Sequence, residues 1–349
     1  MTVAAGPPGI DAAGVTAWFQ AEVPGARPPL RFERLPGGRS NLTYRVRDAA
    51  GGDFVLRRPP LHGVLPSAHD MAREHRIIAA LDGTEVPVPA ALGLCEDPAV
   101  SGAPFYVMAF VEGTVPRDEA TVEAAFDRSA RAAAADSLVG ALVALHRVDP
   151  DAVGLGQLGR REGYLERQLR RWQRQLEQSR TRELPVLDEV HRRLAASVPA
   201  QVGPARVVHG DFRLDNVVLS PAGRVLAVLD WELCTLGDPL ADLGLLLVYW
   251  AEPGDDALPL GTAPTRLPGF PPRAALTARY AAGSGRAVDQ LDYYVAFGYW
   301  KLAVILEGVY ARYAAGAYGE GDDDTWRGFA ATVVQLGERA LEATALAGH

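Results

Sequence analysis

A short segment of the sequence brings together side chains that could bind and transfer a phosphoryl group. Asp211 and Asn216 lie close together, and Asp230 follows the apolar run 225–229. A carboxylate can orient a hydroxyl and accept its proton, whereas a carboxamide oxygen and a second carboxylate offer the hard oxygen ligands that Mg²⁺ prefers. These residue types therefore indicate metal-assisted transfer of phosphate from a nucleotide.

The same residues could instead form a polar turn between two buried strands, because Asp and Asn are common in turns. The flanking segments bear on this choice. Apolar residues lead into the segment at 207–208, continue after it at 217–219, and return at 225–229 after a turn. A carboxylate at the end of each apolar run would direct both charges to one place, which favours a reactive site.

The spacing also matches a known pattern. In the protein-kinase catalytic loop H-R-D-x-x-x-x-N, Asp and Asn are separated as Asp211 and Asn216 are, with Gly210 replacing Arg. Asp230 takes the place of the D-F-G aspartate and is followed by Trp-Glu rather than Phe-Gly. The sequence continues without an A-P-E motif or a long activation segment. We therefore expect neither a protein substrate nor regulation by loop phosphorylation.

Composition bounds the class of protein. The 349 residues suggest two domains or two lobes, and the 48% hydrophobic and 22% charged residues are ordinary for a globular protein. The net charge of −8 argues against nucleic acid as a partner, which would favour a basic face. Cys95 and Cys234 are far apart and lack metal-ligand spacing, so two buried reduced thiols are expected.

The sequence contains no pattern typical of membrane insertion or export. The first nine residues lack the basic start and long apolar core of a signal peptide. The most apolar run, 243–250, is far too short to cross a bilayer. We therefore expect a cytoplasmic enzyme without membrane partners, and we find no pattern that indicates an oligomeric state.

Alternating apolar and polar residues predict a small sheet in the first third of the chain. Between its third and fourth strands, a helix capped by Ser67 should run to Gly83, with apolar residues at helical intervals. This order of three strands, a helix and two strands is that of the small lobe of a protein-kinase-like fold. The expected strands cover residues 30–35, 42–47, 54–57, 91–95 and 104–110.

Beyond a hinge at 111–114 the sequence is mostly helical. The predicted fold class is α+β, a bilobal protein-kinase-like fold with a small antiparallel-sheet N-lobe and a mostly helical C-lobe. Residues 1–112 would form the nucleotide-binding lobe, and residues 113–349 would carry the catalytic loop and the acceptor site. The expected helices cover residues 119–146, 164–177, 240–251, 272–282, 291–314 and 325–346.

The likeness extends well beyond the loop. The chain resembles the aminoglycoside phosphotransferase superfamily, which includes choline-kinase-like enzymes. Within it, the chain most closely resembles the kinase-like phosphotransferase domain associated with acyl-CoA dehydrogenases. The resemblance covers nearly all of the chain after the first thirty residues, and it implies ATP and Mg²⁺ as cofactors. The stretches that carry it are 54–60 with 65–69, 163–172, and 209–216 with 228–233 and 237–243.

By this resemblance, a glycine-rich segment would cover the phosphates of the nucleotide. The residues concerned are Gly37, Gly38, Ser40 and Asn41. Glycine lets backbone N–H groups approach phosphate oxygens closely, and the two polar side chains could add donors. The alternative is an ordinary hairpin, since a glycine pair before a strand is common in turns.

Arg57 takes the place of the lysine that pairs with the α- and β-phosphates in protein kinases. Arginine can bind phosphate bidentately, with a geometry that differs from the point charge of lysine. The neighbouring Arg58 leaves the register open, because strand alternation sends the two side chains to opposite faces; we favour Arg57. Glu74 would be its ion-pair partner, the alternative being a solvated helix glutamate.

The strand that enters the hinge would, by the same resemblance, hold the adenine. The backbone C=O of Ala109 and the backbone N–H of Val111 would bond to the base, and Met108 would lie behind it. The alternative is a buried edge strand, because backbone contacts of this kind leave no side-chain pattern in the sequence.

In the loop, Asp211 would face the acceptor hydroxyl, and Arg213 would neutralise charge on the transferred phosphate. The alternative for Arg213 is an exposed arginine in a surface loop. Asn216 and Asp230 would be the magnesium ligands.

Three further residues are expected to support this loop rather than to react. His209 would be a structural residue, and Asp215 would face solvent. By resemblance, Asp242 would accept hydrogen bonds from the loop backbone, which is a scaffolding role.

Two charged regions bear on the acceptor. Arginines are concentrated at 160–174, and acidic residues at 320–324. A basic face would suit an anionic acceptor such as a hydroxyacyl-CoA, and the resemblance points the same way. An acidic face would suit a cationic aminoglycoside. Both regions could also be ordinary solvated faces, since Glu residues are interspersed among the arginines.

The leading hypothesis is an ATP- and Mg²⁺-dependent phosphotransferase that moves the γ-phosphate to a hydroxyl of a small molecule, for example a hydroxyacyl-CoA. An aminoglycoside, another amino alcohol or a sugar is the alternative acceptor. A hypothesis of a different class is a weakly active nucleotide-binding module that regulates a partner. The intact set Asp211, Asn216 and Asp230 favours the enzyme, because a degraded kinase tends to lose one of them.

Overall fold

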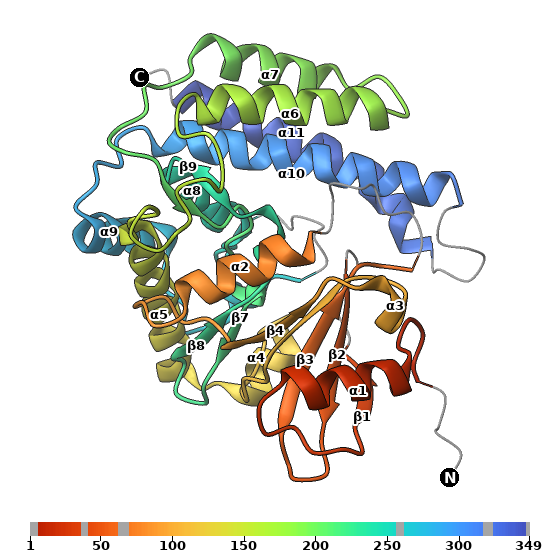
Figure 1. The fold of residues 1–349 in the computed structure, drawn as a ribbon. Coiled ribbons are helices and arrows are strands. Elements are labelled where there is room, and N and C mark those ends of the chain that lie inside the picture. Colours follow the sequence, from red (N-terminus) through yellow and green to blue (C-terminus); the bar gives the residue numbers. More distant parts are fainter. Residues whose placement is uncertain (1–5, 36–40, 62–69, 256–261, 317–323, 347–349) are drawn as a thin grey trace. The chain divides into compact units, whose positions relative to one another are not determined.

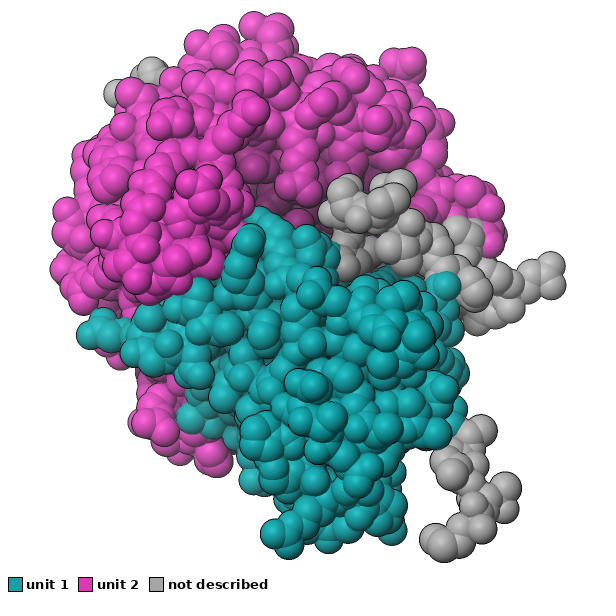
Figure 2. All heavy atoms as spheres, viewed as in Figure 1, with its two compact units in different colours: residues 1–112, 226–232 teal, residues 113–225, 233–349 magenta. Residues whose placement is uncertain are grey.

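The structure is a computed structural model that describes residues 6–35, 41–61, 70–255, 262–316 and 324–346. The chain divides into two compact units, shown in different colours in Figure 2. The first comprises residues 1–112 and 226–232, and the second comprises residues 113–225 and 233–349. The short segment 226–232, which carries Asp230, thus belongs to the first unit.

The first unit is built on an antiparallel sheet of five strands in the order β1-β2-β3-β5-β4 (Figure 1). Inward-facing side chains alternate along the central strands, as in β2, where Leu42, Tyr44 and Val46 are all buried. This sheet, together with the mostly helical remainder, confirms the predicted fold class. The strands are β1 (Arg31–Arg34), β2 (Leu42–Arg47), β3 (Asp53–Arg58), β4 (Ala91–Cys95) and β5 (Phe105–Ala109).

Helix α2 (Met71–Leu81) lies between β3 and β4 in sequence, as predicted, but it begins later than expected. Asp70 is its N-cap and accepts a hydrogen bond from the backbone N–H of Arg73 at 2.9 Å. The proposed cap at Ser67 lies outside the described residues. The buried face of the helix is apolar except for Glu74, which is 2% exposed.

Two helices of the first unit were not predicted: α1 (Ala12–Glu22) and the short α3 (Pro98–Ser101). In α1, Val15 and Phe19 lie one turn apart and are fully buried in a cluster with side chains of the sheet. Burying side chains of this size contributes roughly 1.5–3 kcal/mol each. The helix therefore supplies apolar cover that the sheet needs on one face.

The second unit is mainly helical. The single helix predicted at 119–146 is in fact two helices, because Phe126 is extended and Asp127 starts a new helix by capping the N–H of Ala130. Helix α7 was not predicted. The helices are α4 (Glu119–Ala125), α5 (Arg128–Arg147), α6 (Tyr164–Ser179), α7 (Pro185–Ala196), α8 (Leu240–Tyr249), α9 (Arg273–Ser284), α10 (Leu291–Ala314) and α11 (Phe329–Leu346).

Helices α6, α7, α10 and α11 of this unit pack side by side (Figure 1). α10 also contacts α8, which is buried along almost its whole length. Two short strands, β6 (Arg206–Val208) and β9 (Thr235–Gly237), pair antiparallel within the same unit. The remaining strands are β7 (Val217–Leu219) and β8 (Val225–Val228), and the 3₁₀ turns are η1 (Leu214–Asn216), η2 (Trp231–Leu233), η3 (Pro264–Arg266) and η4 (Asp324–Gly328).

Among the described residues, none of the helices combines the length and the apolar character needed to span a membrane.

Candidate active site

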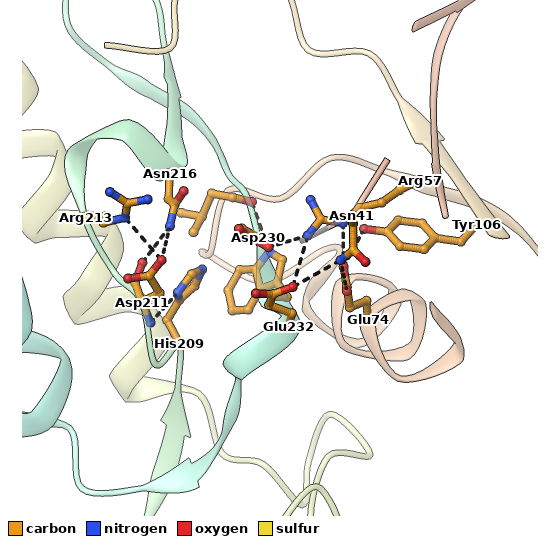
Figure 3. A network of polar contacts seen from close by, with 12 residues as sticks. Asn41, Arg57, Glu74, Tyr106, His209, Asp211, Arg213, Asn216, Asp230 and Glu232 are labelled. Carbon is orange, nitrogen blue, oxygen red and sulfur yellow. Dashed lines mark hydrogen bonds and ion pairs between the residues drawn. The ribbon is translucent and has the colours of Figure 1, made fainter. Parts of the chain in front are cut away.

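The loop 209–216 follows β6 and ends in the turn η1 (Figure 3). The side-chain amide of Asn216 donates through Nδ2 to the backbone oxygen of Asp211 at 2.9 Å and to its Oδ2 at 3.0 Å. These bonds close the loop and fix the orientation of the amide. Asp211 is held at the same time by Arg213, whose Nε lies 3.2 Å from Oδ2. The structure thus brings together the three loop residues to which the sequence assigns chemistry.

Arg213 is not the exposed surface arginine that was the alternative interpretation. Its guanidinium also lies 2.7 Å from the carboxylate of Asp215 and stacks over the ring of Tyr249 at 4.9 Å. Burial alone would lower the pKa of Arg213, but the nearby carboxylates outweigh that effect and raise it. The expectation that Asp215 faces solvent was wrong, because this carboxylate is half-buried and burial raises its pKa.

The loop backbone donates hydrogen bonds to the side chain of Asp242, as the resemblance implied. Its carboxylate accepts the backbone N–H of His209 at 2.6 Å and that of Gly210 at 2.8 Å. Gly210 has a φ of +84°, and a Cβ there would lie 2.7 Å from the carbonyl oxygen of Leu233. Glycine is therefore required at the position where protein kinases carry arginine.

The carboxyl group of Asp242 is fully buried. Burial would raise its pKa, but hydrogen bonds from the backbone and from His146 Nε2, which lies 3.2 Å away, lower it below the ordinary value. Burial lowers the pKa of His146, which fits a neutral imidazole that donates to Asp242 and lies 2.8 Å from the hydroxyl of Tyr280.

Asp242→Ala is expected to destabilise the protein by about 3 kcal/mol or more, because two buried N–H groups and the His146 ring lose their acceptor. Urea unfolding of the variant and the wild type measures the difference. Asp188→Asn is the control: Asp188 is an aspartate that is 44% exposed and pairs with Arg180, so this variant should change stability by less than about 1 kcal/mol.

Asp242 should also make the free energy of unfolding depend on pH under acid conditions. Because the folded-state pKa of Asp242 lies below its unfolded value of about 3.9, its stabilisation is present above that pH and is lost as pH falls through the folded pKa. Unfolding free energies measured below about pH 4 should therefore fall less steeply in Asp242→Asn than in the wild type. Equal slopes in the two proteins would show that the pKa of Asp242 is not lowered in the folded state.

A second group, the Arg57 cluster, lies in the first unit (Figure 3). Arg57 in β3 has its Nε 3.1 Å from Glu74 Oε2, and its Nη2 also pairs with Asp230. The buried amide of Asn41 donates to Glu74 at 3.3 Å and to Glu232 at 3.2 Å. The two members of the cluster predicted as an ion pair, Arg57 and Glu74, therefore do form one.

Charge balance in the Arg57 cluster follows from its burial. Burial alone would lower the pKa of Arg57, but Asp230 and Glu74 raise it well above its ordinary value. Burial raises the pKa of Glu74, and the charge of Arg57 opposes this effect. Burial also raises the pKa of Tyr106, whose hydroxyl donates to Glu74 at 3.1 Å. Arg58 points elsewhere and donates to the carbonyl of Ser101 at 2.8 Å.

Asp230 has an unusual backbone. Among the described residues it is the only residue other than glycine with positive φ, at 65°. Outside glycine this conformation is uncommon and costs about 1 kcal/mol or more, so it persists only where the surroundings impose it. Such positions cluster at functional sites. The role of Asp230 as a magnesium ligand stays a prediction.

The structure describes only some of the other residues predicted to contact the nucleotide. Gly37, Gly38 and Ser40 lie outside the described residues. Met108 is buried in β5, and the backbone N–H of Ala109 bonds to the carbonyl of Ala90 at 2.9 Å. Ala109 is the last residue of β5, and Val111 lies two residues further on in the same unit.

Metal binding can be judged from the donor set. Within the described part of the chain, no three His, Cys, Asp or Glu side chains converge in a way that could hold an ion. Mg²⁺ usually keeps several waters and is held by one or two carboxylates together with phosphates. Asn216, whose amide nitrogen is committed to Asp211, turns its oxygen away from that residue. An amide oxygen and, separately, the carboxylate of Asp230 in the first unit are donor types that suit a nucleotide-bound Mg²⁺ rather than an all-protein cage, and their role as its ligands stays a prediction.

Comparison with known proteins gives the family. Residues 31–292 match the model described as the phosphotransferase enzyme family, often abbreviated APH. The chain belongs to this family. A mouse protein named acyl-CoA dehydrogenase family member 10 is 36% identical over 293 residues, which are 82% of this chain and 27% of that protein. A chicken protein named acyl-CoA dehydrogenase family member 11 is 34% identical over 321 residues, or 90% of this chain and 40% of that protein.

Solved structures agree with the family. A Ralstonia eutropha protein described as a candidate aminoglycoside phosphotransferase is 32% identical, with a TM-score of 0.80, and the match covers 96% of this chain and 98% of that one. A GDP complex of aminoglycoside 2'-phosphotransferase-IIIa shares the fold, with a TM-score of 0.60 and 16% identity over 96% of this chain and 99% of that one. The chain spans 27% to 44% of the length of its curated relatives.

One residue that contacts the loop 209–216 was not identified from the sequence. Lys301 in α10 donates through Nζ to the backbone carbonyl of Gly210 at 2.5 Å. The two residues are 91 positions apart, so no local pattern connects them. A signal was nevertheless present in the composition, because Lys301 is the sole lysine of the chain.

Proposed function

We propose that this protein transfers the γ-phosphoryl group of Mg²⁺·ATP to a hydroxyl of a small molecule. The observation that carries the proposal is the loop 209–216, in which Asn216 and Arg213 converge on the carboxylate of Asp211. Membership of the phosphotransferase enzyme family supports the reaction class. Phosphoryl transfer needs mainly positioning and charge stabilisation, and these are what the loop and the Arg57 cluster offer.

In the proposed reaction, Asp211 orients the acceptor hydroxyl and accepts its proton as the oxygen attacks the γ-phosphorus. The bond to the β-phosphate breaks and ADP leaves. Arg213 stabilises the charge that develops on the transferred group. Mg²⁺, held by Asn216 and Asp230, would neutralise phosphate charge throughout.

Arg57 is proposed to bind the nucleotide phosphates while Glu74 holds it in place. Its planar fork has donors on two sides, so one guanidinium can contact Glu74 and still offer other N–H groups. The segment with Gly37, Gly38 and Ser40 is proposed to cover the phosphates. The backbone at Ala109 and Val111, with Met108 behind, is proposed to receive the adenine.

The role proposed for Asn41 changes with the structure. Both of its amide hydrogens are directed to carboxylates, of Glu74 and Glu232, so they are not available to a phosphate. Its buried Oδ1 has no hydrogen-bond partner among the described residues. A buried acceptor of this kind needs a donor, and a water of the hydrated Mg²⁺ would supply one.

For the acceptor, we propose an acyl-CoA that carries a hydroxyl. The relatives named as acyl-CoA dehydrogenase family members support an acyl-CoA. Exposed arginines of α6, at positions 170, 171 and 174, would suit its phosphates. The acidic run that would favour a cationic aminoglycoside, 320–324, lies mostly outside the described residues.

The test is transfer of label from [γ-³²P]ATP, with Mg²⁺, to a panel of hydroxyacyl-CoAs, aminoglycosides, amino alcohols and sugars. We expect label in a hydroxyacyl-CoA and none without Mg²⁺. Label only in an aminoglycoside or amino alcohol would replace the acceptor. Nucleotide binding without transfer to any member of the panel would favour the regulatory module, and absence of nucleotide binding would overturn the proposal.

A further inference from the structure

Lys301 stands out against the rest of the chain's cations. The sequence has 35 lysine and arginine residues, of which 34 are arginine and one is this lysine. Lys301 lies within α10 and is 8% exposed. Arginine stands at all the other 34 positions, so the use of lysine at this one buried position calls for an explanation from its surroundings.

The ammonium of Lys301 holds the peptide bond that enters the reactive residue. Nζ donates to the carbonyl of Gly210, which belongs to the same peptide as the backbone N–H of Asp211. That N–H is in turn 3.2 Å from Nδ1 of His209. Asp242 accepts the backbone N–H of Gly210, which belongs to the preceding peptide. Two buried ionisable side chains from two helices therefore fix the backbone directly before Asp211.

The shape of the site explains why arginine would not serve there. On one side Nζ meets a single carbonyl oxygen, and on another it lies 5.4 Å from the ring centre of Trp172 in α6. An ammonium is compact and has three donors, whereas a guanidinium is planar, wider and has five. A larger fork in this buried space would push on the loop and leave donors without acceptors.

The charges around Lys301 come from three elements. Burial lowers its pKa, the carboxylates of Asp211 in the loop and Asp242 in α8 raise it, and Arg171 in α6 lowers it further. Burial of an ammonium costs stability unless it is compensated. A buried ammonium that lowers stability and bonds to the loop backbone is expected of a functional residue rather than of one that only fills space.

We propose that Lys301 is a positioning residue that holds the loop 209–216 so that Asp211 faces the acceptor. This inference rests on the proposed phosphotransferase function. Lys301 does not itself touch the reacting atoms; it acts through the carbonyl of Gly210 and through its charge beside Asp211.

The kinetic test compares Lys301→Met and Lys301→Arg with the wild type in release of phosphate from Mg²⁺·ATP, with water as acceptor. Both variants should lose about 10- to 100-fold in kcat, the effect of a small displacement of a reacting group, while KM for ATP stays unchanged. Val333→Ala is the matched control. It removes a fully buried side chain from α11, which packs on α10, and should lower the melting temperature without lowering kcat.

A second test does not depend on turnover. Because the chain has one lysine, protein labelled with [¹⁵N]lysine gives a single side-chain amine signal that needs no assignment. Its titration midpoint should lie below the ordinary lysine value and should fall further in Asp211→Asn, since that carboxylate favours the charged amine.

The outcomes separate the two levels of inference. A wild type that binds no nucleotide would overturn the proposed function and with it the catalytic part of this inference, while the amine signal would still show whether Lys301 lies beside the loop. An active wild type in which Lys301→Met behaves like Val333→Ala would overturn the positioning role alone. A midpoint at the ordinary lysine value that ignores Asp211→Asn would contradict the contact itself.

Discussion

Replacing Asp211 with asparagine is expected to lower the rate of phosphoryl transfer about 10²- to 10⁴-fold, the range for loss of a general base. The amide keeps the size of the side chain and one oxygen for the donors of Asn216 and Arg213, but it cannot take the proton of the hydroxyl. Single-turnover transfer from [γ-³²P]ATP measures the rate, and calorimetry with Mg²⁺·ADP should show nearly unchanged affinity.

Asp215→Asn is the matched control for this variant. Asp215 lies in the same loop, pairs with the same Arg213 and is also half-buried, but the two bonds by which Asn216 closes the loop go to Asp211, so loss of the Asp215 carboxylate should cost far less activity. Equal losses in the two variants would mean that orientation of Arg213, rather than proton acceptance by Asp211, limits the reaction. Transfer at the wild-type rate in Asp211→Asn would contradict the proposed mechanism.

Elements governed by local pattern were predicted well. The strands of the first unit follow from alternation, because every second side chain of a strand such as β2 must enter the core. α1 was missed, although Asp11 is a good cap and Val15 and Phe19 share one face, because its helical state depends on the sheet it covers. The break before Asp127 was missed because an aspartate within an alanine-rich run was not treated as a cap.

The same division holds in the site. Asp211, Arg213 and Asn216 are close in sequence and meet in one loop, so their types and spacing were sufficient to find them. Arg57 and Glu74 required the family resemblance, since strand and helix meet only in the folded unit. Asp215 was placed in solvent because a polar loop residue usually is exposed, whereas here Arg213 and Tyr249 cover that side of the loop.

Asp230→Asn is expected to abolish the Mg²⁺-dependent part of ATP binding. Outer-shell partners of metals typically contribute 10- to 100-fold in affinity, and loss of a direct ligand should cost at least about that much. Asparagine is chosen because it tolerates the positive φ of this position, so that charge is removed without backbone strain. Calorimetry with ATP in the presence and absence of Mg²⁺ measures the difference.

Two further variants make this result specific. Asp230→Ala should melt below Asp230→Asn, because alanine at a φ of 65° adds roughly 1–2 kcal/mol of strain. Glu232→Gln alters a carboxylate of the same Arg57 cluster, which lies 3.9 Å from Arg57 and accepts from Asn41, and it should keep Mg²⁺-dependent binding. If Glu232→Gln loses that dependence and Asp230→Asn keeps it, the metal carboxylate is Glu232, and the strained backbone at Asp230 serves the pairing with Arg57 instead.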